Sequence, residues 1–143
     1  MEHLVLDYNG TIAVDGVLLP GLKRRLAALA ARLRVHIVTA DTFGRAGAQL
    51  RDVACEFIVL ERGGQARAKA AYVRRIGAAR AVCIGNGRND RLMLRAAAVG
   101  IAVVHAEGAA VEAARAADIV VRDARDALDL LLNPLRLVAT LRD

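Results

Sequence analysis

The chain has 143 residues, a length that fits one domain able to bury about two-thirds of the surface that its unfolded form exposes. Hydrophobic residues make up 56% of it but aromatic residues only 3%, which predicts an aliphatic core, and no apolar run reaches the roughly 18 residues of a membrane span. The net charge of +6 is spread as Arg over nearly every predicted helix, without a dense basic tract or interleaved aromatic residues, which argues against a nucleic-acid partner.

Runs of Val, Ile and Leu alternate with Ala- and Arg-rich segments of helical period. The alternation is typical of a three-layer, Rossmann-like α/β fold, with a mostly parallel sheet and helices on both faces. We expect residues 1–143 to form a single domain. The runs predict strands near 3–7, 35–39, 55–60, 81–85, 99–104 and 118–121, and the other segments predict helices at about 20–33, 43–52, 65–77, 89–98, 107–116 and 124–132.

The first predicted strand leads directly into a carboxylate. Residues 4–6 are apolar, Asp7 follows them, and a Gly-containing turn at 8–11 comes next. This order places Asp7 at the carboxyl end of a strand, where open α/β sheets bind their ligands.

A small β-hairpin flap is predicted immediately after this turn. Residues 12–19 contain two apolar runs separated by Asp15-Gly16, a pair that favours a two-residue hairpin turn. The flap would shield one side of Asp7. Pro20 suits the first turn of the following helix, because its missing N–H would be unpaired there in any case.

A second polar loop, Gly85-Asn86-Gly87-Arg88-Asn89-Asp90, follows the strand predicted at 81–85. Between the two loops, Thr39 ends another strand, and Lys69 lies on a helix whose other cations are Arg. Each residue alone has an ordinary alternative, such as a turn, a helix cap or a solvated lysine. Together they supply the parts of aspartyl-phosphate chemistry: a carboxylate nucleophile, a hydroxyl and an ammonium for the phosphoryl oxygens, and a second carboxylate for Mg²⁺.

In these motifs and their order the chain resembles the haloacid dehalogenase (HAD) superfamily of phosphohydrolases and phosphotransferases. It is most similar to the phosphorylation domain of P-type ATPases, whose first motif is Asp-Lys-Thr-Gly-Thr and whose last is Gly-Asp-Gly-Val-Asn-Asp. The resemblance covers essentially the whole chain and implies a soluble, stand-alone relative of that domain. It implies a catalytic set of Asp7, Asn9, Thr39 and Lys69, with Asp7 as the nucleophile. It also implies phosphate contacts from Asp7, Tyr8, Asn9, Gly10, Thr39, Ala40 and Lys69, and a Mg²⁺ site of Asp7, the Asn9 carbonyl, Asn86 and Asp90.

Two positions depart from the family pattern. HAD phosphatases usually carry an Asp two residues after the nucleophile, which protonates the leaving group, and this chain has Asn9 there. General acid–base assistance is commonly worth about 10²–10⁴-fold, so we expect slow hydrolysis or substrates with good leaving groups. P-type ATPases also lack this Asp and hold a long-lived phosphoenzyme. Asn86 stands where a metal-ligating Asp is usual, so we expect weaker Mg²⁺ binding.

The specificity caps of the family are inserted between its first three motifs. Residues 11–35 have room here for the hairpin and one helix, and residues 40–68 for a helix, a strand and a turn. We therefore expect a core domain without a cap. Its open site would admit a phosphorylated small molecule or a large phosphorylated substrate, or would be covered by a second subunit.

The predicted function is Mg²⁺-dependent phosphate-ester hydrolysis through an aspartyl-phosphate on Asp7. The alternative is a catalytically weakened HAD domain that binds phosphate or a nucleotide, or serves as an assembly module. Asn9 and Asn86 support this alternative, whereas the retained Asp7, Thr39, Lys69 and Asp90 argue against it. A receiver-like phospho-acceptor is a third hypothesis, which the Gly-Asn-Gly sequence disfavours.

Three further features bear on environment and assembly. Cys55 and Cys83 lie inside apolar strand patterns, as is typical of buried free thiols. No charged-then-apolar leader opens the chain, so we expect a cytoplasmic protein without a membrane partner. Asn133-Pro134 should break the last predicted helix, and the apolar tail at 135–141 should pack on its own sheet or on another subunit, which favours a homo-oligomer.

Overall fold

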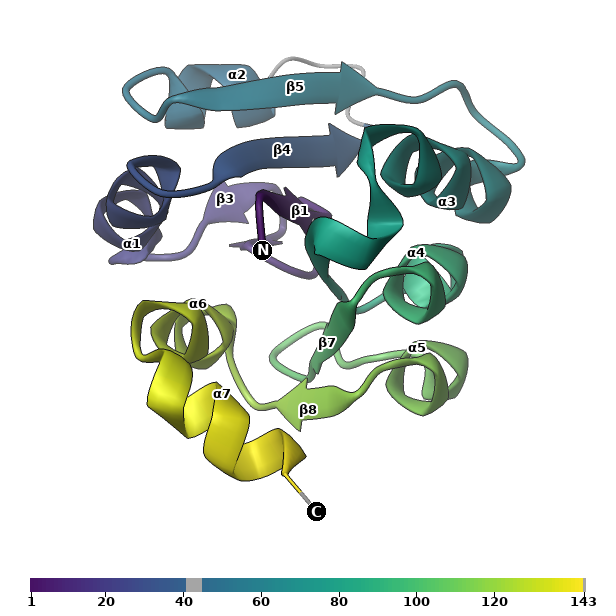
Figure 1. Cartoon of the computed structure of the whole chain (residues 1–143). Coiled ribbons are helices and arrows are strands. Elements are labelled where there is room, and N and C mark those ends of the chain that lie inside the picture. The colour runs from purple at the N-terminus through teal and green to yellow at the C-terminus, as the bar shows by residue number, and fades with distance from the viewer. Residues whose placement is uncertain (41–44, 143) are drawn as a thin grey trace.

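Six parallel strands form the centre of the computed structural model, which describes residues 1–40 and 45–142. They lie in the order β5-β4-β1-β6-β7-β8, which differs from their order in the chain (Figure 1). Every neighbouring pair is parallel, as continuous runs of Val, Ile and Leu predict. The strands are β1 (His3–Leu6), β4 (Arg34–Thr39), β5 (Cys55–Val59), β6 (Ala81–Gly85), β7 (Val99–Val103) and β8 (Ile119–Val121).

Helices cover both faces of this sheet, so the predicted three-layer fold is confirmed (Figure 1). Successive strand residues point to opposite faces. Leu4 and Leu6 therefore belong to one hydrophobic cluster, with residues of α1, α2 and α6, and Val5 belongs to another, with residues of α3, α4 and α5. The helices are α1 (Leu22–Ala30), α2 (Arg45–Leu50), α3 (Gln65–Ile76), α4 (Arg91–Ala96), α5 (Val111–Ala116) and α6 (Ala124–Leu132).

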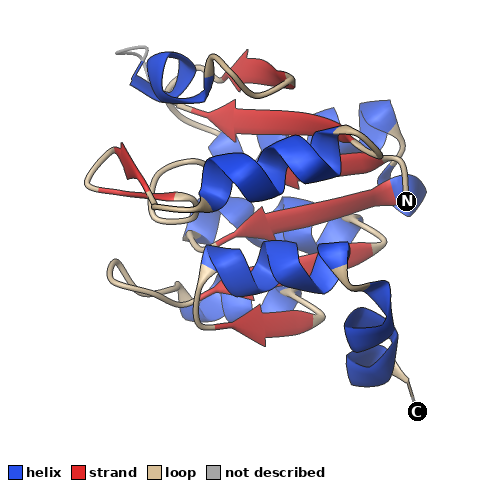
Figure 2. Cartoon of the chain, turned by 90° about the vertical axis from the view of Figure 1, so that its left-hand side faces the viewer, coloured by secondary structure: helices blue, strands red, loops and turns tan. Residues whose placement is uncertain are grey.

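The predicted hairpin is present and pairs β2 (Ala13–Val14) with β3 (Val17–Leu18). Asp15 and Gly16 form its turn with φ angles of 50° and 75°. Two successive left-handed residues are typical of a type I′ turn, which matches the twist of the two strands. Figure 2 shows the hairpin projecting beyond the arrowheads of the central strands, at the carboxyl edge of the sheet.

Several helices begin later than the sequence pattern indicated. α1 begins at Leu22, because Gly21 takes a left-handed φ of 80°, and Pro20 lies in the turn before the helix and not in its first turn. α4 begins after the 3-10 segment η2 (Arg88–Asp90), and α5 begins only at Val111, so these predicted first turns belong to loops at the carboxyl edge. α2 begins at Arg45; the first two residues expected in it, 43 and 44, lie outside the described residues.

The segment after α6 is a further helix. α6 ends at Leu132, as predicted, and Pro134 is the first residue of α7 (Pro134–Leu141), a position that its missing N–H suits. Leu137 packs against the core, but Leu135 and Val138 are 85% and 60% exposed. The tail therefore packs on its own domain along one side only. In Figure 2 it lies at the end of the molecule away from the hairpin.

The described helices are too short for a membrane span, since the longest, α3, has 12 residues. Both cysteines are free thiols, as predicted. Cys83 is buried in the central strand β6, whereas Cys55 is only half-buried because β5 is an edge strand.

β1 marks the point at which the chain changes the direction in which it adds strands. Its neighbours are β4 on one side and β6 on the other, so the connections that follow lead away from each other. Such a point leaves a crevice outside the carboxyl ends of the strands, and open α/β proteins bind ligands there. Asp7, Thr39 and the loop after β6 therefore meet at one place.

Candidate active site

The loop after β1 holds Asp7 at the carboxyl edge of the sheet. The Asp7 N–H donates to the Ile84 carbonyl at 3.0 Å and continues the pairing of β1 with β6. Asp7 is only 7% exposed. The carboxylate thus lies in a place from which most water is excluded.

A tight turn follows Asp7 and lets the loop after β6 approach. The N–H groups of residues 11–13 donate to the Tyr8 carbonyl, which closes the turn. Gly10 in this turn has a φ of 75°, and a Cβ on it would lie 2.4 Å from the amide nitrogen of Asn86. Any side chain at residue 10 would displace that loop, so the contact requires the Gly of the motif.

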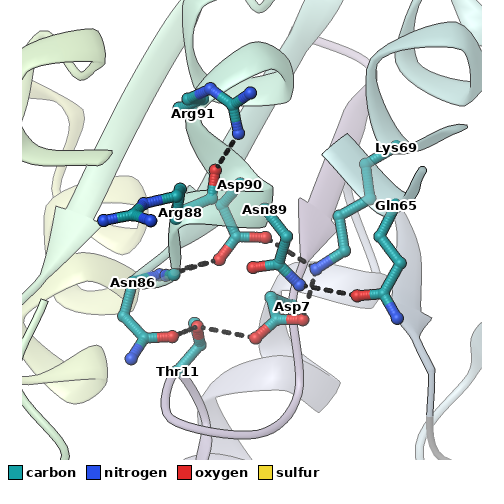
Figure 3. Close-up of polar contacts among 10 residues, drawn as sticks. Asp7, Thr11, Gln65, Lys69, Asn86, Arg88, Asn89, Asp90 and Arg91 are labelled. Atoms are coloured by element: carbon teal, nitrogen blue, oxygen red, sulfur yellow. Dashed lines mark hydrogen bonds and ion pairs between the residues drawn. The ribbon is translucent and has the colours of Figure 1, made fainter. Parts of the chain in front are cut away.

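Lys69 connects the two loops. Its Nζ donates to Asp7 Oδ1 at 2.5 Å and to Asp90 Oδ1 at 2.6 Å, and its side chain is 1% exposed (Figure 3). The alternative of a solvated lysine is therefore excluded. Lys69 lies on α3 and brings the helix, the first loop and the second loop to a single point.

The loop after β6 folds around the Asp90 carboxylate. Asp90 Oδ2 accepts from the backbone N–H groups of Asn86 at 3.0 Å and Gly87 at 2.8 Å, while Oδ1 accepts from Lys69. Gly85 allows this packing, because a Cβ there would lie 2.5 Å from Asp90 Cγ. Both Asp90 oxygens hold the protein's own groups, which positions Lys69 and shapes the loop. The role of Asp90 as a metal ligand stays a prediction.

The charges of this cluster do not cancel. Two carboxylates share one ammonium where water scarcely reaches, so ionising both leaves a net negative charge. Burial, and then repulsion from Asp90, raises the pKa of Asp7 from its usual 3.8 to about 7, against the opposing attraction of Lys69. Burial disfavours the charged form of Lys69, but Asp7 and Asp90 outweigh it and raise the pKa of Lys69. A cation bound here would relieve the excess of negative charge.

Three side-chain oxygens converge beside the cluster. Thr11 Oγ1 lies 3.2 Å from Asp7 Oδ2 and 3.1 Å from Asn86 Oδ1. One hydroxyl proton cannot serve both acceptors fully. The Asn86 amide is held in this orientation because its Nδ2 donates to the Gly108 carbonyl at 3.0 Å. The site therefore has more hydrogen-bond acceptors than donors.

This donor set fits a hard divalent cation with oxygen ligands. Mg²⁺ usually binds one or two carboxylates and keeps several waters. Among the described residues no three His, Cys, Asp or Glu side chains gather as a metal group, so an ion would depend on Asp7 together with uncharged oxygens such as that of Asn86. Asn9, whose backbone carbonyl the resemblance implies as a ligand, is exposed and lies two residues after Asp7.

The other predicted residues lie at the same edge of the sheet as the cluster. Thr39 ends β4, the neighbour of β1, and is 2% exposed; Ala40 follows it and is half-buried. Tyr8 is fully buried, and its hydroxyl donates to the Gly16 carbonyl at 3.3 Å. The Tyr8 side chain therefore supports the hairpin, and the phosphate contact expected of this residue stays a prediction. Residues 41–44 lie outside the described part of the chain.

Several residues that shape the site were missing from the predicted set. Thr11 is one, and its carbonyl lies 2.8 Å from His105 Nε2. Gln65 and Asn89 form another contact, since Gln65 Oε1 accepts from Asn89 Nδ2 at 2.9 Å. His105 comes directly after the strand predicted at 99–104, and this position at a strand end could have marked it as a site residue. The Gln65–Asn89 contact had no such signal, because it joins a helix to a distant loop.

Comparison with known sequences yields two archaeal relatives. No protein-family model matches the chain. The chain is 55% identical over 62 residues to the uncharacterized protein MJ0073 of Methanocaldococcus jannaschii, a match that covers 43% of this chain and 67% of that protein. It is 49% identical over 39 residues to MJ0072 of the same organism, which covers 27% of this chain and 89% of that protein.

Comparison with solved structures identifies the fold. 3-Deoxy-D-manno-octulosonate 8-phosphate phosphatase from Moraxella catarrhalis, in complex with magnesium, phosphate and KDO, matches with a TM-score of 0.76 and 15% identity, covering 99% of this chain and 94% of that chain. A structure described as a HAD superfamily hydrolase from Legionella pneumophila matches with a TM-score of 0.73 and 15% identity, over 99% and 87% of the two chains. The catalytic domain of the CPx-ATPase CopB-B matches with a TM-score of 0.63 and 23% identity, over 80% and 46%.

Proposed function

We propose that this chain, which belongs to the same family as MJ0073 and has the fold of the HAD superfamily hydrolases, is a Mg²⁺-dependent phosphohydrolase that forms an aspartyl-phosphate on Asp7. The observation that carries the proposal is the contact of Lys69 with both Asp7 and Asp90 at the switch point of the sheet. A buried carboxylate that faces a buried ammonium in a crevice is poised to receive a phosphoryl group.

In the first step Asp7 acts as the nucleophile. One Asp7 oxygen forms a bond to phosphorus while the bond from phosphorus to the leaving-group oxygen breaks. Lys69 orients the carboxylate from 2.5 Å and supplies positive charge for the phosphoryl oxygens. The leaving oxygen keeps the bonding pair and takes a proton from solvent, because the amide of Asn9 is too weak an acid to supply one.

In the second step water attacks the phosphorus of the aspartyl-phosphate. The bond between phosphorus and the Asp7 oxygen breaks, phosphate leaves, and the carboxylate is regenerated. The attacking water loses its proton to solvent, since Asn9 cannot act as a general base. We therefore expect the phosphoenzyme to be long-lived.

Mg²⁺ would be held by Asp7, Asn86 and the Asn9 carbonyl, with Asp90 close by. When bound, the ion reduces the repulsion between the anionic nucleophile and the anionic substrate. The neutral Asn86 should make this binding weak. Asn86→Asp should tighten Mg²⁺ binding in a calorimetric titration, and unchanged affinity would remove Asn86 from the ligand set.

The proposal is tested by screening phosphorylated metabolites for phosphate release with Mg²⁺, beside Asp7→Asn. We expect activity to fall at least about 10³-fold in that variant. Asp52→Asn is the matched control, because Asp52 is exposed and forms only a 3.9 Å surface pair with Lys23. Beryllium fluoride with Mg²⁺ should raise the melting temperature of the unmodified protein but not that of Asp7→Asn. Activity that persists without Asp7 would disprove the mechanism.

A substitution at position 9 distinguishes the proposed phosphohydrolase from the alternative, a weakened domain that only binds phosphate. Asn9→Asp should raise turnover of poor leaving groups more than that of p-nitrophenyl phosphate, whose leaving group needs little protonation. An equal change on both would contradict the role of position 9. If neither protein turns over any ester while both bind phosphate, the binding alternative is favoured.

The half-packed helix α7 further supports a homo-oligomer. Leu135, Val138 and Leu141 are exposed at helical spacing, and a second subunit would remove this apolar area from water. Light scattering should therefore detect a dimer or a larger assembly. A monomer at all concentrations would contradict the proposal.

A further inference from the structure

A cationic pocket adjoins the candidate active site on the side of α3. It has a volume of about 470 Å³ and is formed by the loop before α3 and the η2 segment. We call it the arginine pocket; the side chains that give it its character are Arg67, Arg88 and Arg91. No Asp or Glu is among the described residues that line it.

Among the described residues, two of the three guanidinium groups form no ion pair with a carboxylate, although the Glu112 carboxylate lies near enough to Arg91 to attract it. Arg88 pairs with Glu112 at 2.8 Å. Arg91 donates to the backbone carbonyl of Arg88, and the Arg67 side chain has no hydrogen-bond or ion-pair partner among the described residues. The pocket therefore has positive charge available for a ligand. Arg is suited to bind a carboxylate or a phosphate with two parallel hydrogen bonds.

The backbone adds to this positive character. α3 begins at Gln65 with Gly64 as its N-cap, and no side chain caps its first N–H groups. The partial positive charge of a helix N-terminus favours anions. Gly63 and Gly64 both line the pocket, and a Cβ on either would meet nothing within 4 Å, so this wall is open to a ligand.

The pocket shares a wall with the catalytic cluster. Gln65 lies one helical turn before Lys69, about 6 Å along the axis, and Asn89 directly precedes Asp90. Gln65 and Asn89 line the pocket and hydrogen-bond to each other, as Figure 3 shows. A group bound by the arginines would therefore lie beside the space that a phosphoryl group at Asp7 occupies.

We infer that the substrate is a phosphate monoester whose leaving group carries a second anionic group, a carboxylate or another phosphate, which the arginine pocket binds through Arg67 and Arg91. The inference rests on the proposed function for the identity of the first phosphate. It supplies a source of specificity for an open site, because a neutral leaving group would leave the guanidinium groups without a partner.

Matched substrate pairs test the inference. Glycerol 3-phosphate is compared with 3-phosphoglycerate for the carboxylate, and fructose 6-phosphate with fructose 1,6-bisphosphate for the phosphate. We expect kcat/KM to be about tenfold or more higher for the member with the second anion. Arg67→Gln with Arg91→Gln should remove this preference. For the substrate without the second anion, kcat/KM should change by less than about twofold. Whichever pair responds identifies the anion.

Arg32→Gln is the control for the loss of a positive charge away from the site, and it is compared with Arg67→Gln and Arg91→Gln made singly. Arg32 is exposed and precedes β4, so it lies at the amino edge of the sheet, opposite the site. We expect it to leave the preference unchanged. Hydrolysis without a preference, or a preference equally sensitive to Arg32→Gln, would overturn the inference and leave the proposed function intact.

A binding measurement covers the case in which no ester is hydrolysed. Calorimetric titration of Asp7→Asn protein with 3-phosphoglycerate or fructose 1,6-bisphosphate measures binding to the arginine pocket in the absence of turnover. Binding that weakens about tenfold or more on Arg67→Gln with Arg91→Gln would support the pocket while the proposed function fails. Affinity that is the same with and without these arginines, or absence of binding, would overturn the inference itself.

Discussion

Two buried polar clusters lie along β1, β4 and α3, and they differ in how far their groups satisfy one another. The end of β4, helix α3 and the loop after β1 contribute Thr39, Lys69 and Asp7 to the candidate site. The same two strands and helix contribute His3, His36 and Tyr72 to a second cluster, which lies nearer the amino ends of the strands. Lys69 and Tyr72 are three residues apart on α3 and so lie on one face of the helix.

The second cluster pairs its groups in a chain. His3 Nδ1 lies 3.0 Å from His36 Nε2, and His36 Nδ1 lies 2.8 Å from the Tyr72 hydroxyl. Burial is the main reason that the pKa of His36 lies below its usual value, which favours the neutral imidazole, whose two nitrogens can act as one donor and one acceptor. This cluster is satisfied within the fold.

The site cluster contains more charge and more acceptors than the fold can satisfy. One ammonium serves two carboxylates, and one hydroxyl proton serves two oxygens. The comparison shows where a ligand is needed. Buried polar groups that satisfy one another stabilise the fold. Buried groups without enough partners destabilise it, and a ligand that supplies the missing partner lowers the free energy.

Lys69→Met should have the largest effect on stability. Removing the ammonium leaves two buried carboxylates without their counter-charge, and breaking a buried pair in this way costs about 3–5 kcal/mol. Urea unfolding at pH 8 measures the loss. Lys23→Met is the control, because the other lysine is half-exposed and its surface pair is worth about 0–1 kcal/mol. Equal losses for both variants would contradict the buried role of Lys69.

Asp7→Asn should stabilise the protein at pH 8 while it abolishes activity. The pKa of Asp7 is raised to about 7, so between pH 4 and pH 7 the folded state binds more protons than the unfolded state. Stability is therefore lost as pH rises through this window, and Asn at residue 7 escapes the loss. The gain at pH 8 should be on the order of a few kcal/mol and should fade towards pH 4. A gain independent of pH would contradict this account.

Tyr72→Phe should cost less, about 1–2 kcal/mol, because it removes one hydrogen bond and leaves His36 Nδ1 buried without that partner. Phosphatase activity should be unchanged, since the cluster does not reach the site. A matching loss of activity and stability would show that the two clusters are coupled through α3.

The smallest expected effect is the pH dependence of stability that His36 causes, and its sign is opposite to that caused by Asp7. His36 has a lowered pKa in the folded state, so below its unfolded pKa of about 6.5 the unfolded state binds more protons. Stability should therefore fall as pH drops below 6.5, most visibly in Asp7→Asn protein, where the opposing contribution is absent. His36→Gln in that background should flatten the dependence, and an unchanged slope would assign it to other groups.

Local patterns in the chain were enough to predict the layers and the loops. Alternating apolar and helical segments predicted all six strands of the sheet, and Asp15-Gly16 predicted the hairpin turn, because these features depend on residues close in sequence. The placement of Thr39 at a strand end, and of Asp7 and Asp90 in the loops that follow two other strands, was predicted for the same reason. The start of α1 was wrong, since a left-handed Gly21 outweighed the preference of Pro20 for a first turn.

The tertiary structure alone decided which of these groups meet and with what balance of charge. Lys69 was predicted as a site residue only together with the other motifs, since alone it has the ordinary alternative of a solvated lysine; the order β5-β4-β1-β6-β7-β8 brings its helix over Asp7 and Asp90. The same order sets Thr11 beside Asn86 and places the arginine pocket next to the site. Such contacts join segments that are distant in the chain, and no local periodicity encodes them; they arise when two hydrophobic faces of one sheet are covered by helices.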